Sequence, residues 1–296
     1  MGKRGSAIKE LSTPVVSERS HKMAAEFYHQ INDFHAMGLK TDPNVEIEFY
    51  SNVLHNLRNP VERTYIPKDA YIFMPSSASK CKRELYLHLT GNKKNADEDR
   101  LPYHHRWVRN STAVHEAVQK DFLYMRKYMP ESNFQIHLVD GIPMWEENLK
   151  TTTLVDHKGV QFALVGQMDG ILRYVPENKL IGFEFKTKTN SVAQVGTYKM
   201  KDIADSHKLQ AVCYKIMFGL DEFIFMYEAV AKDQWFKGKE ARMDIRVFYI
   251  EVTDQMVEEM KDKFYDVIKA IEAKEVPDKE LDKCMLCDYK TICGGL

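Results

Sequence analysis

The sequence predicts an α/β fold in which a central mixed sheet is flanked by helices. Residues 162–175 and 180–187 are rich in β-branched, aromatic and aliphatic side chains, and a Pro-Glu-Asn-Lys turn signal separates them, which is typical of a β-hairpin. On both sides of this hairpin, apolar residues recur every three or four positions, as in amphipathic helices. Strands in the middle and helices in the flanks therefore favour a layered architecture.

The composition is that of an ordinary globular protein. Its 296 residues suffice for one large domain or two small ones, and 42 Lys and Arg nearly balance 43 Asp and Glu. The whole chain is therefore not a polycation, and any nucleic-acid surface must be a local groove. The sequence has no apolar run of about 18 residues and no signal-peptide core, so we expect a cytoplasmic protein without a membrane span.

The chain is expected to divide into an N-terminal extension, residues 1–75, and a larger domain, residues 76–296. Residues 1–19 are polar and aperiodic, which is typical of a loose tail. Apolar residues at helical spacing then predict helices over residues 21–39 and 45–57, which we interpret as scaffold or a family-specific cap.

Two further helices are predicted before the hairpin. A helix over residues 76–91 would start at a serine N-cap and carry Cys81 in its first turns, where the helix N-terminus and neighbouring cations favour a thiolate. A helix, or a pair of helices, over residues 101–129 carries His115 beside its apolar stripe. Such a histidine is usually a core or boundary residue, and it becomes a metal ligand only if the helix packs across the mouth of the hairpin.

The hairpin carries the residues from which chemistry can be predicted. In its second strand, the period of two directs three apolar residues to a core face and Glu184 and Lys186 to the other face. Asp169 on the first strand can lie opposite or diagonal to Glu184, close enough for one divalent cation to bridge both carboxylates.

This pair of carboxylates indicates a cation site. Two carboxylates in a partly dry site repel each other unless a proton or metal compensates, and oxygen ligands select Mg²⁺ or Mn²⁺. Such a cation can polarise a phosphodiester and acidify a bound water, while Lys186 orients that water or steadies the developing negative charge. The pattern predicts a metal-dependent nuclease, and the alternative is a surface hairpin with an ordinary Glu/Lys face.

The segments after the hairpin would complete the site. The linker 190–201 carries several lysines without acids up to Lys201, which suits contacts with backbone phosphates or a solvated loop. A helix over residues 205–218 places Gln210 and Tyr214 on one face, directed at the site. Further strands are predicted over residues 134–139, 142–145, 151–155, 222–230 and 245–252, and a final helix over residues 255–273.

Five cysteines in a reducing compartment are better explained as metal ligands or buried thiols than as disulfides. Cys284, Cys287 and Cys293 form a C-x2-C-x5-C pattern, and Cys81 is the first candidate for a fourth ligand. Cys213, which we expect to be a core thiol, and a histidine are lesser candidates. Four cysteinates fit either a tetrahedral zinc or a [4Fe-4S] cluster, and spacing does not decide between them. The remaining alternative is an unliganded Cys-rich tail.

Taken together, these motifs resemble RecB-like nucleases of the PD-(D/E)XK superfamily. The resemblance rests on the order and approximate spacing of His115, Asp169-Gly170, the E-F-K motif at residues 184–186 and the Q-x3-Y motif that begins at Gln210. The single upstream Cys81 followed by C-x2-C-x5-C resembles the iron-sulfur branch, typified by CRISPR-associated RecB-family exonucleases and the AddB nuclease domain. The resemblance covers residues 76–293. One departure is Ser111-Thr112, which stands where the family often has Gly-Thr before its histidine.

The resemblance implies a restriction-endonuclease-like core with an N-terminal helical extension and a C-terminus stapled by a [4Fe-4S] cluster. It also implies roles for individual residues. The metal ligands would be His115, Asp169, Glu184 and the carbonyl of Phe185; the catalytic residues Asp169, Glu184 and Lys186; the DNA contacts Gln210 and Tyr214; and the cluster ligands Cys81, Cys284, Cys287 and Cys293.

We therefore expect a DNA exonuclease that acts on ends or single strands with Mg²⁺ or Mn²⁺, in which the cluster is structural. The alternatives are an end- or flap-specific endonuclease, a non-catalytic DNA-binding assembly subunit, and a zinc-stabilised version of the same nuclease. The sequence contains no helicase P-loop, so we expect a stand-alone nuclease or a subunit of something larger, whose partner would be a helicase or a recombination or adaptation protein. Viral and CRISPR-adaptation roles are equally compatible with these motifs.

Overall fold

The structure, a computed structural model, describes residues 17–60, 65–95 and 101–294. Its strands are β1 (Tyr71–Phe73), β2 (Phe134–Ile136), β3 (Leu138–Val139), β4 (Ile142–Pro143), β5 (Thr151–His157), β6 (Val160–Gly166), β7 (Gly170–Tyr174), β8 (Lys179–Lys188), β9 (Glu222–Ala229) and β10 (Ile245–Glu251). The central sheet has the order β10-β9-β8-β7-β2, and a smaller sheet has the order β1-β6-β5. In the central sheet β8 and β9 are parallel and the other pairs are antiparallel, which confirms a mixed sheet.

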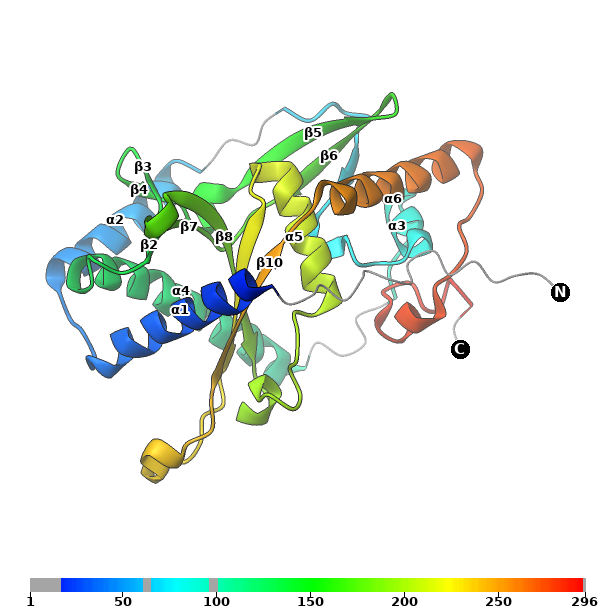
Figure 1. Cartoon of the computed structure of the whole chain (residues 1–296). Helices are drawn as coiled ribbons and strands as arrows, with labels where there is room; N and C mark the ends of the chain where they lie inside the picture. Colours follow the sequence, from blue (N-terminus) through cyan, green and yellow to red (C-terminus); the bar gives the residue numbers. More distant parts are fainter. Residues whose placement is uncertain (1–16, 61–64, 96–100, 295–296) are drawn as a thin grey trace.

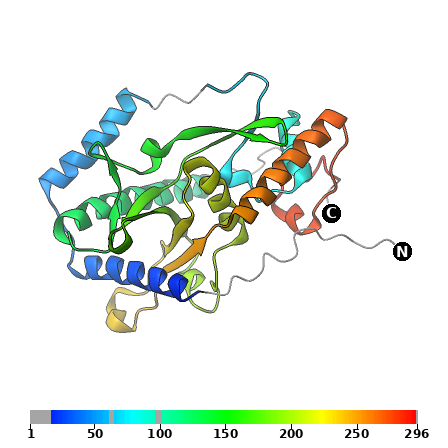
Figure 2. The ribbon, with the colours of Figure 1, turned by 45° about the horizontal axis from the view of Figure 1, so that its top comes forward.

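Helices cover both faces of the central sheet (Figure 1). One side holds α1 (Glu18–Ala36), α2 (Pro43–Arg58) and α4 (Pro102–Tyr128), and the other holds α3 (Lys82–Leu89), α5 (Asp205–Phe218) and α6 (Asp254–Ala273). The tilted view shows α6 and α3 side by side next to the C-terminal segment (Figure 2). The α/β prediction is confirmed, and the predicted long helix is a single element, α4.

The helices follow the apolar periodicity of the sequence. In α1 the buried positions Met23, Phe27, Ile31 and Phe34 are three or four residues apart, so one face packs on the sheet. Its N-cap is Ser17, so α1 begins earlier than residue 21, and the rest of the predicted tail, residues 1–16, lies outside the described residues. None of the described helices has the length and apolar content needed to cross a membrane.

The prediction of one strand over residues 162–175 was wrong. The segment divides into β6 and β7, which belong to different sheets: β6 pairs with β5 and β1, whereas β7 pairs with β8 and β2. The crossing occurs at residues 167–169, where Met168 is fully buried between the layers. Local β propensity extends through the segment, but hydrogen-bonding partners decide where each strand ends.

The outer face of β8 also differs from the prediction, because it is buried as well. Alternation does direct Ile181, Phe183 and Phe185 into the apolar cluster beneath α1 and α4, but the opposite face is also covered, by α5. Glu184 is only 1% exposed as a result. At Gly182 a Cβ would lie 2.2 Å from the ring of Phe223, so only glycine permits this close packing. A strand with two buried faces lacks the clean alternation of a half-exposed one.

The helix predicted over residues 76–91 starts later than expected. A 3-10 turn, η1 (Pro75–Ser77), precedes it, and Cys81 is the N-cap of α3, with its Sγ accepting a hydrogen bond from the backbone N–H of Glu84 at 3.3 Å. The sulfur thus lies at the N-terminal end of the helix.

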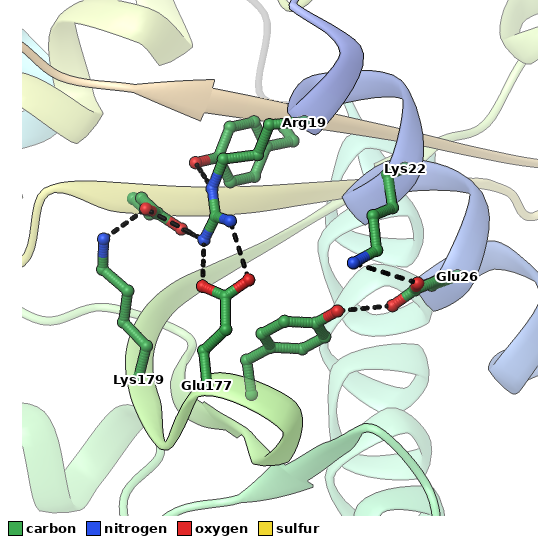
Figure 3. Close-up of polar contacts among 8 residues, drawn as sticks. Arg19, Lys22, Glu26, Glu177 and Lys179 are labelled. Atoms are coloured by element: carbon green, nitrogen blue, oxygen red, sulfur yellow. Dashed lines mark hydrogen bonds and ion pairs between the residues drawn. The ribbon is translucent and has the colours of Figure 1, made fainter.

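Arg19 fastens α1 to the central sheet (Figure 3). Its guanidinium donates to both carboxylate oxygens of Glu177 at 2.9 and 2.8 Å, to Glu222 at 2.8 Å and to the hydroxyl of Tyr249 at 3.1 Å. Lys179 also binds Glu222, which is 2% exposed. These partners lie on or beside the first residues of β8 and β9 and the end of β10, so α1 is tied to the sheet at three strands.

The Arg19→Ala variant is expected to lower the free energy of unfolding by about 1.5–3 kcal/mol, because it removes charge-assisted hydrogen bonds from a buried carboxylate. Urea denaturation measures this change. Lys22→Ala is the matched control on the same helix, since Lys22 is exposed and its ion pair with Glu26 is 3.9 Å long; we expect a change below about 0.5 kcal/mol. Equal losses in both variants would contradict an anchoring role for Arg19.

Candidate metal centre and cysteine cluster

The β7–β8 hairpin brings Asp169 next to the E-F-K motif. Gly170 at the start of β7 is paired with Phe183, so Asp169 lies beside the following residues of β8. The backbone N–H of Phe185 donates to Asp169 Oδ2 at 2.7 Å, which fixes the orientation of this carboxylate. The predicted proximity of Asp169 and the motif is therefore present in the structure.

His115 reaches the same place from α4. Its Nδ1 lies 3.8 Å from Asp169 Oδ1, and its ring packs edge-on against Phe185 with centroids 4.8 Å apart. Ser111, one turn earlier on α4, shares a 2.8 Å hydrogen bond with Thr187 at the end of β8. The helix thus packs across the mouth of the hairpin, which is the condition under which His115 can serve as a ligand.

Glu146 completes this group, and the sequence interpretation missed it. Its Oε1 lies 3.0 Å from His115 Nδ1, and ligand atoms of His115, Glu146 and Asp169 all lie within 4.8 Å of one another. The backbone N–H of Glu146 donates to the carbonyl of Asp169 at 3.4 Å, and the preceding Trp145 forms a β-bridge with Gly170. The only signal in the sequence was the pair of acids that directly follows the strand predicted over residues 142–145.

Glu184 lies deeper, and its two oxygens differ. Oε1 accepts hydrogen bonds from Lys186 Nζ and from Gln210 Nε2, the latter at 2.9 Å. Oε2 is buried and has no hydrogen-bond partner among the described residues. A buried carboxylate oxygen without a partner is costly, and a cation bound at this oxygen would remove the cost.

Gln210 and Tyr214 lie behind Glu184 and are both buried. Gln210 donates to the Tyr214 hydroxyl at 2.6 Å, and that hydroxyl donates to the carbonyl of Gln167 at 2.8 Å. In this arrangement the two side chains orient Glu184. The DNA contact that the family resemblance implies for them stays a prediction.

Burial and the charge of a neighbouring carboxylate raise the pKa values of Asp169 and Glu184. Desolvation raises the pKa of Asp169 to about 6, against the opposing effects of Lys186 and the Phe185 N–H. Desolvation and the charge of Asp169 raise the pKa of Glu184 to about 7. The neighbouring carboxylates hold the pKa of Lys186 above its ordinary value in spite of its burial, so this side chain is a cation. Raised carboxyl pKa values are typical of functional sites.

These residues fit a hard divalent cation. The imidazole of His115 on α4 and the carboxylate of Asp169, just before β7, converge on one point together with Glu146. On β8, a buried oxygen of Glu184 has no partner among the described residues. In the metal-free protein, protons can take the place of the cation, because burial raises the pKa values of Asp169 and Glu184.

The Glu146→Gln variant is expected to weaken Mn²⁺ binding by about 10-fold, because it replaces an anionic donor beside His115 and Asp169 with a neutral amide. Isothermal titration calorimetry measures this affinity. Glu147→Gln is the matched control, since the neighbouring Glu147 pairs with Lys150 at the surface instead. Unchanged Mn²⁺ affinity in Glu146→Gln would exclude Glu146 from the metal centre.

The fold also gathers the four predicted cluster cysteines. Cys81 at the N-terminus of α3 lines one small cavity together with the cysteines of the C-terminal segment, where η6 (Leu281–Leu286) contributes the first of them. The cavity is lined by Cys81, Cys284, Cys287 and Cys293, with Glu84 and Lys279 among the other residues. Residues about 200 positions apart in the sequence are thus neighbours.

Hydrogen-bond donors surround these sulfurs. Besides the Glu84 N–H on Cys81, the N–H of Tyr289 donates to Cys287 Sγ at 3.4 Å, and Arg83 Nη1 lies 3.8 Å from Cys293 Sγ. Such donors are typical of the surroundings of metal-bound sulfur. The fifth cysteine, Cys213, lies in the core, where burial raises its pKa to about 12, so the expected core thiol is confirmed.

Comparison with known proteins places this geometry in context. A profile of the family described as the PD-(D/E)XK nuclease superfamily matches residues 18–294. Among solved structures, SSO0001 is 12% identical, with a TM-score of 0.43 over 85% of this chain and 96% of that chain. An alkaline exonuclease from Laribacter hongkongensis, LHK-Exo, is 16% identical, with a TM-score of 0.40 over 68% of this chain and 88% of that chain. No curated protein matches the chain.

Proposed function

Because the chain belongs to the PD-(D/E)XK nuclease superfamily, we propose that it is a metal-dependent deoxyribonuclease, and specifically an exonuclease acting on DNA ends or single strands. The observation that carries this proposal is the convergence of His115, Asp169, Glu184 and Lys186 at the β7–β8 hairpin. The preference for an exonuclease rests on the resemblance to RecB-like nucleases of the iron-sulfur branch. DNA is accordingly the proposed substrate, and a helicase or recombination protein the proposed partner.

In this proposal His115, Glu146, Asp169, Glu184 and the Phe185 carbonyl hold Mg²⁺ or Mn²⁺. The chemistry supplied by such a cation is polarisation of the phosphodiester and acidification of water. The Phe185 N–H holds one oxygen of Asp169, so that the other faces His115, while Gln210 and Lys186 hold Oε1 of Glu184 and leave Oε2 available. The ammonium of Lys186, 24% exposed, is the group placed to stabilise negative charge that develops on the phosphate.

We further propose that the four gathered cysteines hold a [4Fe-4S] cluster with a structural role. The preference for the cluster over zinc rests on the resemblance to the iron-sulfur branch. Reduced cysteines in such a site also favour a cytoplasmic location.

The test uses anaerobically purified protein and linear DNA labelled at the 5′ or 3′ end, single- and double-stranded, beside closed circles, with Mg²⁺ or Mn²⁺. Loss of one end's label with circles intact is the expected result. Cleavage of circles would instead establish an endonuclease. DNA binding without hydrolysis, by a protein that retains its cluster, would overturn the enzymatic proposal in favour of an assembly subunit.

Hydrolysis is expected to fall as the pH drops through about 7 and about 6, because protons compete with the cation for Glu184 and Asp169, whose pKa values are raised to these levels in the metal-free protein. The ionised carboxylates bind the cation, so activity is present above this window and lost below it. Initial rates over a pH series at two Mn²⁺ concentrations measure the effect. More Mn²⁺ should move the midpoint to lower pH, and a midpoint independent of Mn²⁺ would contradict the competition.

A further inference from the structure

The N-terminal part of α4 extends beyond the metal centre and exposes a cluster of aromatic rings. Tyr103 and Trp107 are 43% and 45% exposed, and their rings meet edge-on with centroids 5.7 Å apart. The ring of His104 packs beside this pair, with its centroid 4.1 Å from that of Tyr103 and 6.1 Å from that of Trp107. Rings of this size are normally buried on folding, so a surface cluster of them indicates a binding site.

This aromatic cluster is continuous with the metal centre. Tyr103, Trp107, Ser111 and His115 are spaced by four residues, so successive members lie next to each other along the helix. Ser111 is hydrogen-bonded to Thr187 at the end of β8, and His115 lies in the metal centre. The N-terminal end of α4 and the segment that follows β8 lie at the same end of the central sheet (Figure 1).

The helical rise fixes the scale of this arrangement. At 1.5 Å per residue, Trp107 lies about 12 Å along α4 from His115, and Tyr103 about 18 Å. A stacked DNA strand advances about 3.4 Å per nucleotide, and an extended strand advances further. The two rings are therefore within a few nucleotides of a phosphate held at the metal centre.

The charge of this stretch suits a nucleic acid. Residues 101–115 include Arg106 and Arg109 and no Asp or Glu, and both arginines are exposed. Aromatic rings together with arginines form the type of surface that binds single-stranded DNA, in which bases stack on the rings and cations contact the backbone. In duplex DNA the base faces are already stacked on each other and are not available to such rings.

We infer that Tyr103 and Trp107 form a stacking platform for single-stranded DNA, which binds the strand a few nucleotides from the phosphate that is hydrolysed. The inference rests on the proposed nuclease function and adds the substrate class: a single strand or the unpaired end of a duplex. Blunt duplex DNA gains nothing from the platform. Loss of the platform therefore weakens the binding of single strands selectively.

The test measures binding of a fluorescein-labelled single-stranded oligothymidylate and of a blunt duplex of equal length by anisotropy, in EDTA, so that hydrolysis cannot occur. Trp107→Ala and Tyr103→Ala are each expected to weaken the binding of the single strand by about 5- to 100-fold and that of the duplex by less than 2-fold. Trp235→Ala is the matched control, because Trp235 is fully exposed on the segment between β9 and β10. Circular dichroism confirms that each variant is folded.

A second measurement uses tryptophan fluorescence directly. The chain has three tryptophans, and Trp145 is buried, so in a Trp235→Phe background quenching by the oligothymidylate reports on Trp107. Wild-type affinity of Trp107→Ala for the single strand, or an equal loss in Trp235→Ala, overturns the platform. Quenching of Trp107 in a protein that never hydrolyses DNA supports the platform and refutes the nuclease. Hydrolysis without any effect of Trp107→Ala refutes the platform alone.

Discussion

Glu184→Gln is expected to reduce DNA hydrolysis by at least about 10³-fold, because the variant loses the anionic oxygen that is left free for the cation and the charge that holds Lys186 in place. The amide is isosteric, so the surrounding hydrogen bonds from Gln210 can persist in part. Single-turnover hydrolysis of end-labelled DNA at saturating Mn²⁺ measures the loss. Wild-type hydrolysis by Glu184→Gln at saturating Mn²⁺ would show that the residue only tunes metal affinity.

The same substitution is expected to remove a pH dependence from the stability of the metal-free protein. The pKa of Glu184 is about 7 in the folded protein and about 4.5 in the unfolded chain, so the folded state binds the proton more tightly. The stabilisation of the folded state that comes from protonation of Glu184 is therefore fully present below about pH 4.5, and it is lost as the pH rises through 7. The difference amounts to roughly 3 kcal/mol, at 1.4 kcal/mol for each pKa unit.

Urea denaturation of the metal-free protein over this pH range measures the effect. The wild-type protein should lose stability as the pH rises, and Glu184→Gln should lose much less, with the remaining slope coming from Asp169. Glu251→Gln, a change of an exposed carboxyl in β10, is the matched control and should behave as the wild type. Identical slopes in the wild type and Glu184→Gln would mean that Glu184 is not protonated on folding.

Cys287→Ser is expected to remove the cluster and to destabilise the protein by about 5 kcal/mol. The physical reason is loop closure: a cluster that joins Cys81 to the C-terminal segment cross-links a loop of about 200 residues, which restricts the unfolded chain strongly. The oxygen of serine is a poor ligand for iron compared with a thiolate. Iron and labile-sulfide analysis, visible absorption and thermal denaturation under anaerobic conditions measure the outcome.

Cys213→Ala provides the matched control, since Cys213 is buried in the core and does not line the cysteine cavity. That variant should keep its iron and colour, although it loses some packing energy. A colourless wild-type protein that contains zinc would establish the zinc alternative. A wild-type protein without any metal, and with full stability in Cys287→Ser, would show that the cysteines are not ligands.

The sequence determined those features that depend on local patterns. Periodicity of 3.6 predicted α1, α2, α4, α5 and α6, because each helix buries one face irrespective of its partners. The turn between β7 and β8 and the E-F-K motif specified the hairpin that brings Asp169 beside Phe185, because hairpin pairing joins neighbours in the sequence. The four cysteines could be chosen as candidate metal ligands from the sequence. A chain with only five cysteines rarely has three of them in a C-x2-C-x5-C pattern by chance.

The tertiary structure alone decided how distant segments meet. It divided residues 162–175 between two sheets, covered the second face of β8 with α5, and left Glu184 almost fully buried. It also placed Glu146 3.0 Å from His115, a contact between segments about 30 residues apart. The apolar periodicity of the sequence indicates which face of a helix or strand is buried, but it does not indicate which other element covers that face. For this reason the candidate ligands within the hairpin could be predicted from the sequence, whereas Glu146, the unpartnered oxygen of Glu184 and the aromatic cluster on α4 could not.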